Sequence, residues 1–88
     1  MITYEATIAK DSWTELLNGE TSLFLDITGS TPIGLYFSEL STIPPLDAPI
    51  SIVYPHKGGW DFQTSGLAVG QKLFARGLNY DVEVTVVR

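Results

Sequence analysis

Apolar and polar residues alternate along several short segments of the chain, which is the pattern of strands with one buried face. The last segment is the clearest, because Val82, Val84 and Val86 alternate with Glu83 and Thr85. The alternation predicts six strands, at residues 2–9, 22–28, 33–38, 50–54, 72–76 and 81–87. Glycine and proline separate them at short intervals. We therefore expect an all-β fold, a small antiparallel β-sandwich or barrel of about six to seven strands.

One stretch predicts a short helical turn instead. Ser12 and Glu15 have the spacing of a capping box, in which each side chain bonds a backbone N–H of the first turn. Gly19 then ends the helix after about two turns at most. Because so short a helix is marginal on its own, we expect Trp13 to anchor it across one end of the sandwich as a plug in the core.

Two irregular stretches connect the predicted strands. Residues 38–49 contain three prolines and indicate a long connection between sheets. In residues 55–70, Gly58 and Gly59 permit a tight turn, so residues 54–57 and 60–63 are interpreted as the two arms of a hairpin. Since the chain contains no linker, repeat or low-complexity tract, residues 1–88 are interpreted as a single β-sandwich domain.

Charge and composition narrow the classes of partner. Five Lys and Arg residues against ten Asp and Glu residues give a net charge of −5. This balance argues against nucleic acid or an anionic membrane surface as a partner, since both require clustered positive charge. No apolar run approaches the roughly 20 residues that cross a bilayer, and no signal-peptide pattern is present, so no membrane partner is expected. The absence of cysteine excludes disulfides and thiolate metal sites.

The sequence offers little catalytic chemistry. His56 is the one histidine and cannot form a histidine zinc site alone. No G-x-S-x-G nucleophile motif is present, and most acidic residues alternate outward along strands or lie in turns. We therefore expect no catalytic residues, no metal and no cofactor, and a protein that is not an enzyme. A small hydrolase that uses His56 is the remaining catalytic alternative.

Three aromatic residues have the opposite parity to the aliphatic residues of their own strands: Phe24, Tyr36 and Phe74. If they form one outward stripe, the apolar patch is too large for a monomer to leave in water. This favours self-association into a closed homo-oligomer, with a trimer preferred over a dimer. The alternative is that both faces of these strands are covered within the domain.

Trp60 is the most suggestive single side chain. It follows Gly58-Gly59 and is flanked by His56, Asp61 and Phe62. Such a tryptophan can anchor a protein contact or stack on a sugar ring, or it can cover the end of the core as a lid. The predicted partner-binding residues are therefore Trp60, Phe62, His56, Phe24, Tyr36 and Phe74. The competing function is a small carbohydrate-binding module with an exposed Trp60 platform, to which His56 and Asp61 contribute ligand-facing groups.

Three stretches together resemble small structural proteins of tailed-phage virions. They are residues 12–19 with the apolar strand at 24–27, the proline-rich residues 42–49, and residues 70–77 followed by the terminal strand 81–87. Residues 70–77 read G-Q-K-L-F-A-R-G, similar to the G-x-x-L-aromatic-A-R approach to a closing valine-rich strand in such proteins. The resemblance implies a β-sandwich located in the virion, as a head decoration, cement or tail-accessory subunit that binds a capsid or tail protein. It brings no catalytic residues.

Overall fold

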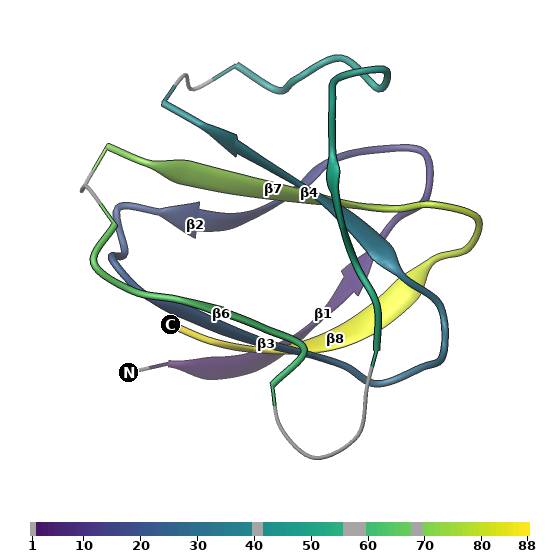
Figure 1. The fold of residues 1–88 in the computed structure, drawn as a ribbon, viewed down its shortest axis with the longest axis horizontal. Helices are drawn as coiled ribbons and strands as arrows, with labels where there is room; N and C mark the ends of the chain where they lie inside the picture. Colours follow the sequence, from purple (N-terminus) through teal and green to yellow (C-terminus); the bar gives the residue numbers. More distant parts are fainter. Residues whose placement is uncertain (1, 40–41, 56–59, 68–69) are drawn as a thin grey trace.

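The computed structural model describes residues 2–39, 42–55, 60–67 and 70–88, and within them it contains eight strands and no helix. The strands are β1 (Thr3–Ile8), β2 (Thr14–Asn18), β3 (Leu23–Ile27), β4 (Ile33–Ser38), β5 (Ser51–Val53), β6 (Phe62–Thr64), β7 (Lys72–Gly77) and β8 (Val82–Val87). They form two antiparallel sheets, sheet A in the order β1-β8-β3-β6 and sheet B in the order β2-β7-β4-β5 (Figure 1). The predicted all-β sandwich is confirmed.

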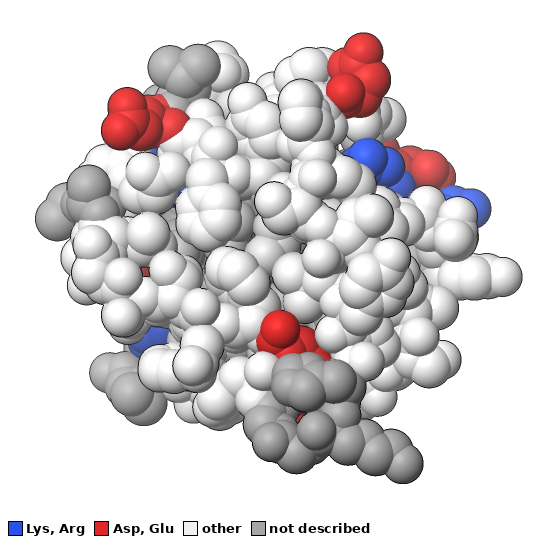
Figure 2. All heavy atoms as spheres, viewed as in Figure 1, with Lys and Arg blue, Asp and Glu red and all other residues white. Residues whose placement is uncertain are grey.

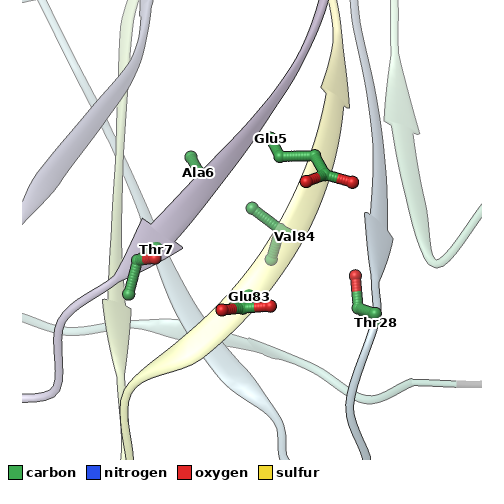
Figure 3. A pocket seen from close by; sticks show the side chains of 6 residues that line it. All are labelled: Glu5, Ala6, Thr7, Thr28, Glu83 and Val84. Atoms are coloured by element: carbon green, nitrogen blue, oxygen red, sulfur yellow. The ribbon is translucent and has the colours of Figure 1, made fainter.

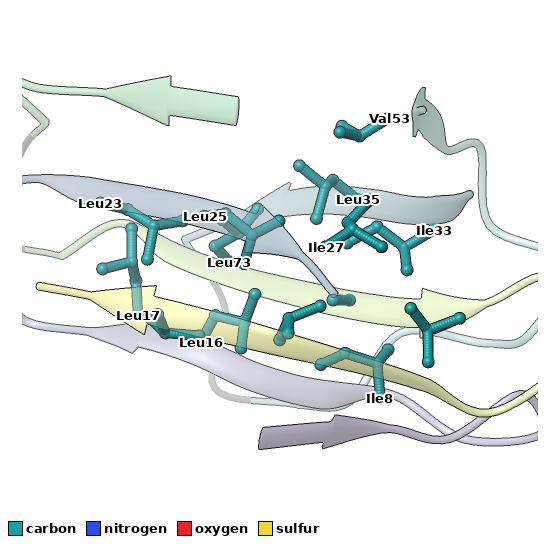
Figure 4. Packing of buried hydrophobic residues seen from close by; sticks show 14 residues of the cluster. Ile8, Leu16, Leu17, Leu23, Leu25, Ile27, Ile33, Leu35, Val53 and Leu73 are labelled. Atoms are coloured by element: carbon teal, nitrogen blue, oxygen red, sulfur yellow. The ribbon is translucent and has the colours of Figure 1, made fainter. Parts of the chain in front are cut away.

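The core lies between the two sheets (Figure 4) and is made by inward-facing aliphatic residues. It comprises Ile8, Leu16, Leu17, Leu23, Leu25, Ile27, Ile33, Leu35, Val53, Leu73, Ala75, Val82, Val84 and Val86. Strand β8 lies inside sheet A, between β1 and β3, and its even-numbered valines are buried while Glu83 is exposed. The predicted inward face of the terminal strand is therefore confirmed.

The predicted helical turn at residues 12–17 is wrong, because this stretch contains strand β2. β2 pairs with β7, with Glu15 opposite Phe74 and Leu17 opposite Leu73. Leu16 is the extra residue of a β-bulge, which allows Leu16 and Leu17 to reach the core together. A capping box gives a two-turn helix too little stability to compete with a ladder of backbone hydrogen bonds along β7.

Residues 42–50, which connect β4 to β5, cover the outer face of sheet B and lie above β4 and β7 in Figure 1. The indole Nε1 of Trp13 donates a hydrogen bond to the Pro45 carbonyl at 3.2 Å. A Cβ atom at Gly34 would lie 2.7 Å from Ile50 Cδ1, so glycine is what lets Ile50 pack this closely on β4. Pro44 is buried in the same connection. The proline-rich connection is thus a packed layer on sheet B.

Trp13 is buried, with 9% of its surface exposed, but it does not plug an end of the core as predicted. Its ring lies 6.0 Å from the Tyr36 ring, between centroids, and the Arg76 guanidinium carbon is 5.2 Å from its centroid. Tyr36 and Arg76 both alternate with core residues of their strands, so they lie on the outer face of sheet B. Trp13 is therefore held between sheet B and the connection that covers it.

The predicted hairpin with arms at residues 54–57 and 60–63 is not formed by its described residues, because Tyr54 and Pro55 lie in no strand and Phe62 and Gln63 pair with β3. β5 pairs with β4 in sheet B, whereas β6 pairs with β3 in sheet A. The chain therefore crosses from one sheet to the other between β5 and β6, and the two glycines lie outside the described residues. A short apolar strand followed by glycines does not reveal which neighbour it will pair with.

Arg88 joins the two sheets at one end of the sandwich. It follows β8 of sheet A, and its Nη1 donates to the Leu16 carbonyl of β2 in sheet B at 2.8 Å. The same nitrogen lies 3.3 Å from the Glu20 carboxylate, and the guanidinium carbon lies 5.0 Å from the centre of the Tyr4 ring. These contacts fix the last residue of the chain against β1 and β2.

Candidate functional site

The predicted contact residues separate into two groups on opposite sheets. Phe24 lies on β3 of sheet A, whereas Tyr36 and Phe74 lie opposite one another on β4 and β7 of sheet B. The prediction of one outward aromatic stripe is therefore wrong. His56 lies outside the described residues. Residue parity within a strand correctly separates the two faces of that strand, but it does not tell which sheet the strand joins.

Phe74 is not available as an open surface, and Tyr36 is partly buried. Phe74 is only 2% exposed, although it alternates with the core residues Leu73 and Ala75. It lies on the face occupied by Trp13 and by residues 42–50. The alternative that both faces are covered within the domain therefore holds at Phe74 of β7, whereas Ile52 on the outer face of β5 stays 47% exposed.

Large exposed apolar side chains are instead concentrated in residues 42–54, a range called here the 42–54 segment. Four of them are Ile43 (69% exposed), Leu46 (50%), Ile52 (47%) and Tyr54 (64%). The segment contains one charged residue, Asp47. This exposed apolar segment was not predicted from the sequence, although thirteen residues with a single charge could have indicated it.

A second aromatic site lies where β3 and β6 meet. The Trp60 and Phe24 ring centroids are 5.7 Å apart, with 45° between the ring planes. Trp60 is 40% exposed and contacts Phe24 outside the core cluster, so it is not a lid over the core. Phe62, two residues later, packs against the core and lies 6.2 Å from the Phe37 ring of sheet B. Trp60 therefore lies at the surface beside Phe24, whereas Phe62 packs against the core.

Asp61 holds this aromatic segment on β3. Its backbone N–H donates to the Leu25 carbonyl at 2.9 Å, and its Oδ2 accepts from the Ile27 N–H at 2.6 Å. A carboxylate that accepts a backbone N–H forms a charge-assisted hydrogen bond, which is stronger than a neutral one. The two bonds fix the backbone on which Trp60 and Phe62 stand. From the sequence, Asp61 was interpreted as a ligand-facing residue, and its anchoring role could not be foreseen without the β3–β6 register.

An open hollow lies beside Phe24. It is lined by Phe24 and by the uncharged polar residues Gln63, Thr64 and Ser65. Gln63 stands directly opposite Phe24 in the β3–β6 ladder. No sequence pattern singled out these three residues, because only the ladder brings them to Phe24.

Away from Phe24 and its cross-strand neighbour Val87, the outer face of sheet A is polar. Glu5, Thr85 and Asp26 form one row across β1, β8 and β3. Figure 3 shows a hollow on this sheet whose lining includes Glu5, Glu83 and Thr28. Within the described parts of the chain, no group of three His, Cys, Asp or Glu side chains is arranged to hold a metal ion.

Comparison with known proteins gives no match: no family model, no curated protein and no solved structure matches the chain. In residues 2–39, 42–55, 60–67 and 70–88, no helix is long and apolar enough to cross a membrane.

Proposed function

We propose that this chain is a non-enzymatic structural subunit of a virion, a head decoration, cement or tail-accessory protein. It self-associates, as a trimer in preference to a dimer, and it binds a capsid or tail protein. The observation that carries the proposal is the 42–54 segment, with four large apolar side chains exposed beside a single charge. Clustered apolar residues at a surface mark sites of protein–protein contact.

The distribution of charge favours contact through this segment. Six of the ten acidic residues lie in residues 5–39, and Asp47 alone lies in the 42–54 segment. Charged groups are also sparse over the side of the molecule drawn in Figure 2. Copies that meet through a surface with a single charge have little close repulsion despite the net charge of −5. Each square ångström of apolar area buried contributes about 25 cal/mol, partly offset by the cost of association.

The class of partner is supported by the resemblance of residues 12–27, 42–49 and 70–87 to small proteins of tailed-phage virions. The fold is compatible with it, because a compact β-sandwich exposes side chains on connecting loops while the two sheets hold those loops in place. The 42–54 segment includes the proline-rich part of that resemblance. The proposed contact surface and the resemblance therefore overlap at residues 42–49, which include Ile43 and Leu46.

The location is tested on particles from cells that carry the gene. Particles are purified on a density gradient, probed with an antibody against the chain, and examined by immunogold electron microscopy. Labelling at regular positions on heads or tails is the expected result. If the chain is absent from intact particles and remains in the unassembled fraction, the virion function is wrong.

Self-association is tested by light scattering after size exclusion at micromolar concentration. We expect a mass three times the 9.6 kDa of one chain, and we expect Tyr54→Ser combined with Ile43→Ser to dissociate the oligomer. Tyr80→Ser is the matched control, because Tyr80 is 64% exposed like Tyr54 but lies outside the 42–54 segment. A monomeric wild-type chain overturns self-association, and equal effects of Tyr54→Ser and Tyr80→Ser overturn the assignment of the surface.

A further inference from the structure

The Phe24–Trp60 pair is a fixed aromatic surface on sheet A. Asp61 ties the backbone next to Trp60 to β3 through two hydrogen bonds, at 2.6 and 2.9 Å. Phe24 is itself a β3 residue, so both rings are attached to the same strand. Aromatic rings held in this way bind a ligand face without a large loss of side-chain entropy. Trp60 nevertheless keeps 40% of its surface exposed.

The groups beside this aromatic surface select a particular chemistry. Gln63 contributes an amide with two donors and an acceptor, and Thr64 and Ser65 contribute hydroxyls that both donate and accept. Among the residues that the structure describes, no charged side chain lines the hollow. A ligand that matches it has an apolar face for the rings, many hydroxyl groups at its rim, and no net charge.

We infer that the Phe24–Trp60 pair and the hollow lined by Gln63, Thr64 and Ser65 bind a neutral sugar ring. The C–H face of the sugar packs on Trp60 and Phe24, and its hydroxyls exchange hydrogen bonds with Gln63 and its neighbours. Ligand sites commonly combine an aromatic wall with a few polar groups that fix orientation. The binding is independent of the proposed virion function, because it uses residues outside the 42–54 segment.

A protein partner fits this surface less well. Asp26 follows Phe24 by two residues on the same face of β3, and Thr85 and Glu5 continue its row across the sheet. The cores of protein interfaces are depleted of Asp and Glu. Hydroxyl-rich sugars, in contrast, donate readily to such carboxylates. The polar surroundings of the rings therefore favour a sugar.

The experiment is a titration of the ¹⁵N-labelled full chain with neutral oligosaccharides, followed by NMR. Glucose, mannose, galactose and N-acetylglucosamine oligomers are tested separately up to about 10 mM, because a single small site of this kind is expected to bind in the millimolar range. The Trp60 indole signal should shift with at least one of them. The Trp13 indole is an internal control, since it is buried and bonded to the Pro45 carbonyl.

Three variants locate the binding. Trp60→Ala should weaken it at least about tenfold, as expected for a central aromatic anchor. Gln63→Ala should weaken it less, and Tyr80→Ala, which removes an aromatic residue that is 64% exposed elsewhere, should leave it unchanged. The amide spectrum of each variant reports whether the fold is retained.

Several results would overturn the inference. They are no shift with any neutral sugar, shifts that persist in Trp60→Ala, and binding restricted to charged sugars such as glucuronate oligomers. If sugars have no effect but Trp60→Ala dissociates the oligomer in light scattering, the surface is a protein contact. Failure of the virion test alone leaves the sugar titration unaffected, so the two proposals fail separately.

Discussion

The outer faces of the two sheets differ in what covers them, although both sheets contain four antiparallel strands. On sheet A, outward residues such as Glu5, Asp26 and Thr85 form a polar surface. On sheet B, Tyr36 and Phe74 face outward on the side of Trp13 and residues 42–50, and Phe74 is 2% exposed. A strand with large apolar side chains on both faces therefore requires a cover, and here one irregular connection supplies it without a helix or a third sheet.

The composition of the connection explains how it can lie on an apolar face. Pro44, Pro45 and Pro49 have no backbone N–H, so fewer donors need partners when the segment packs on the sheet. The Pro45 carbonyl accepts from the Trp13 indole at 3.2 Å and from the Ala48 N–H at 3.0 Å. The connection thus satisfies polar groups where it meets sheet B while Ile43 and Leu46 remain exposed.

The largest expected difference between the two faces comes from removing one phenylalanine on each. Phe74→Ala should cost about 3–5 kcal/mol, because Phe74 is only 2% exposed on the outer face of sheet B. Phe24→Ala should cost only about 1 kcal/mol, since its ring is half-buried on the open face. Urea unfolding measures both. Equal losses would show that the two faces are covered to the same extent.

The contact between the connection and β4 is tested at Gly34. A Cβ there would lie 2.7 Å from Ile50 Cδ1, so Gly34→Val should cost about 1–3 kcal/mol through overpacking. Ile50→Ala in the same chain should recover part of that loss. Gly29→Ala is the matched control, because a Cβ at Gly29 would meet nothing within 4 Å, and it should change stability by less than about 0.5 kcal/mol. If the double variant is no more stable than Gly34→Val alone, the loss of stability does not come from contact with Ile50.

The alternation of residues was sufficient to predict an all-β sandwich and the inward face of β8, because period-two burial is a local property. It was insufficient for the outer faces, because Phe24, Tyr36 and Phe74 share a parity but belong to different sheets. At the aromatic site, Trp60 was recognisable from the sequence. Its support by Asp61 and its proximity to Gln63 depend on pairing between distant strands, which no local pattern specifies.

A smaller effect is expected from loosening the connection rather than removing a ring. Trp13→Phe removes the indole donor but leaves the Pro45 carbonyl bonded to the Ala48 N–H, so the cost should be about 1 kcal/mol. Hydrogen exchange at Ala48 should accelerate about fivefold if residues 42–50 open locally. Exchange at Val84 in the core should accelerate only by the factor that the loss of global stability predicts. If exchange at Ala48 and at Val84 accelerates by the same factor, the connection does not open separately from global unfolding.

The smallest expected effect is a gain on the open face of sheet A. Thr85 stands between Glu5 and Asp26 in one cross-strand row, so Thr85→Lys places an ammonium group between two carboxylates. Opposite charges on neighbouring strands contribute roughly 0.2–1 kcal/mol, and exposed pairs weaken as salt rises. Urea unfolding at low salt should reveal this gain, and about 1 M salt should remove most of it. Thr85→Gln introduces a long uncharged side chain at the same position. It should give no salt-dependent gain in stability, because the gain comes from the charge of the lysine on the exposed face.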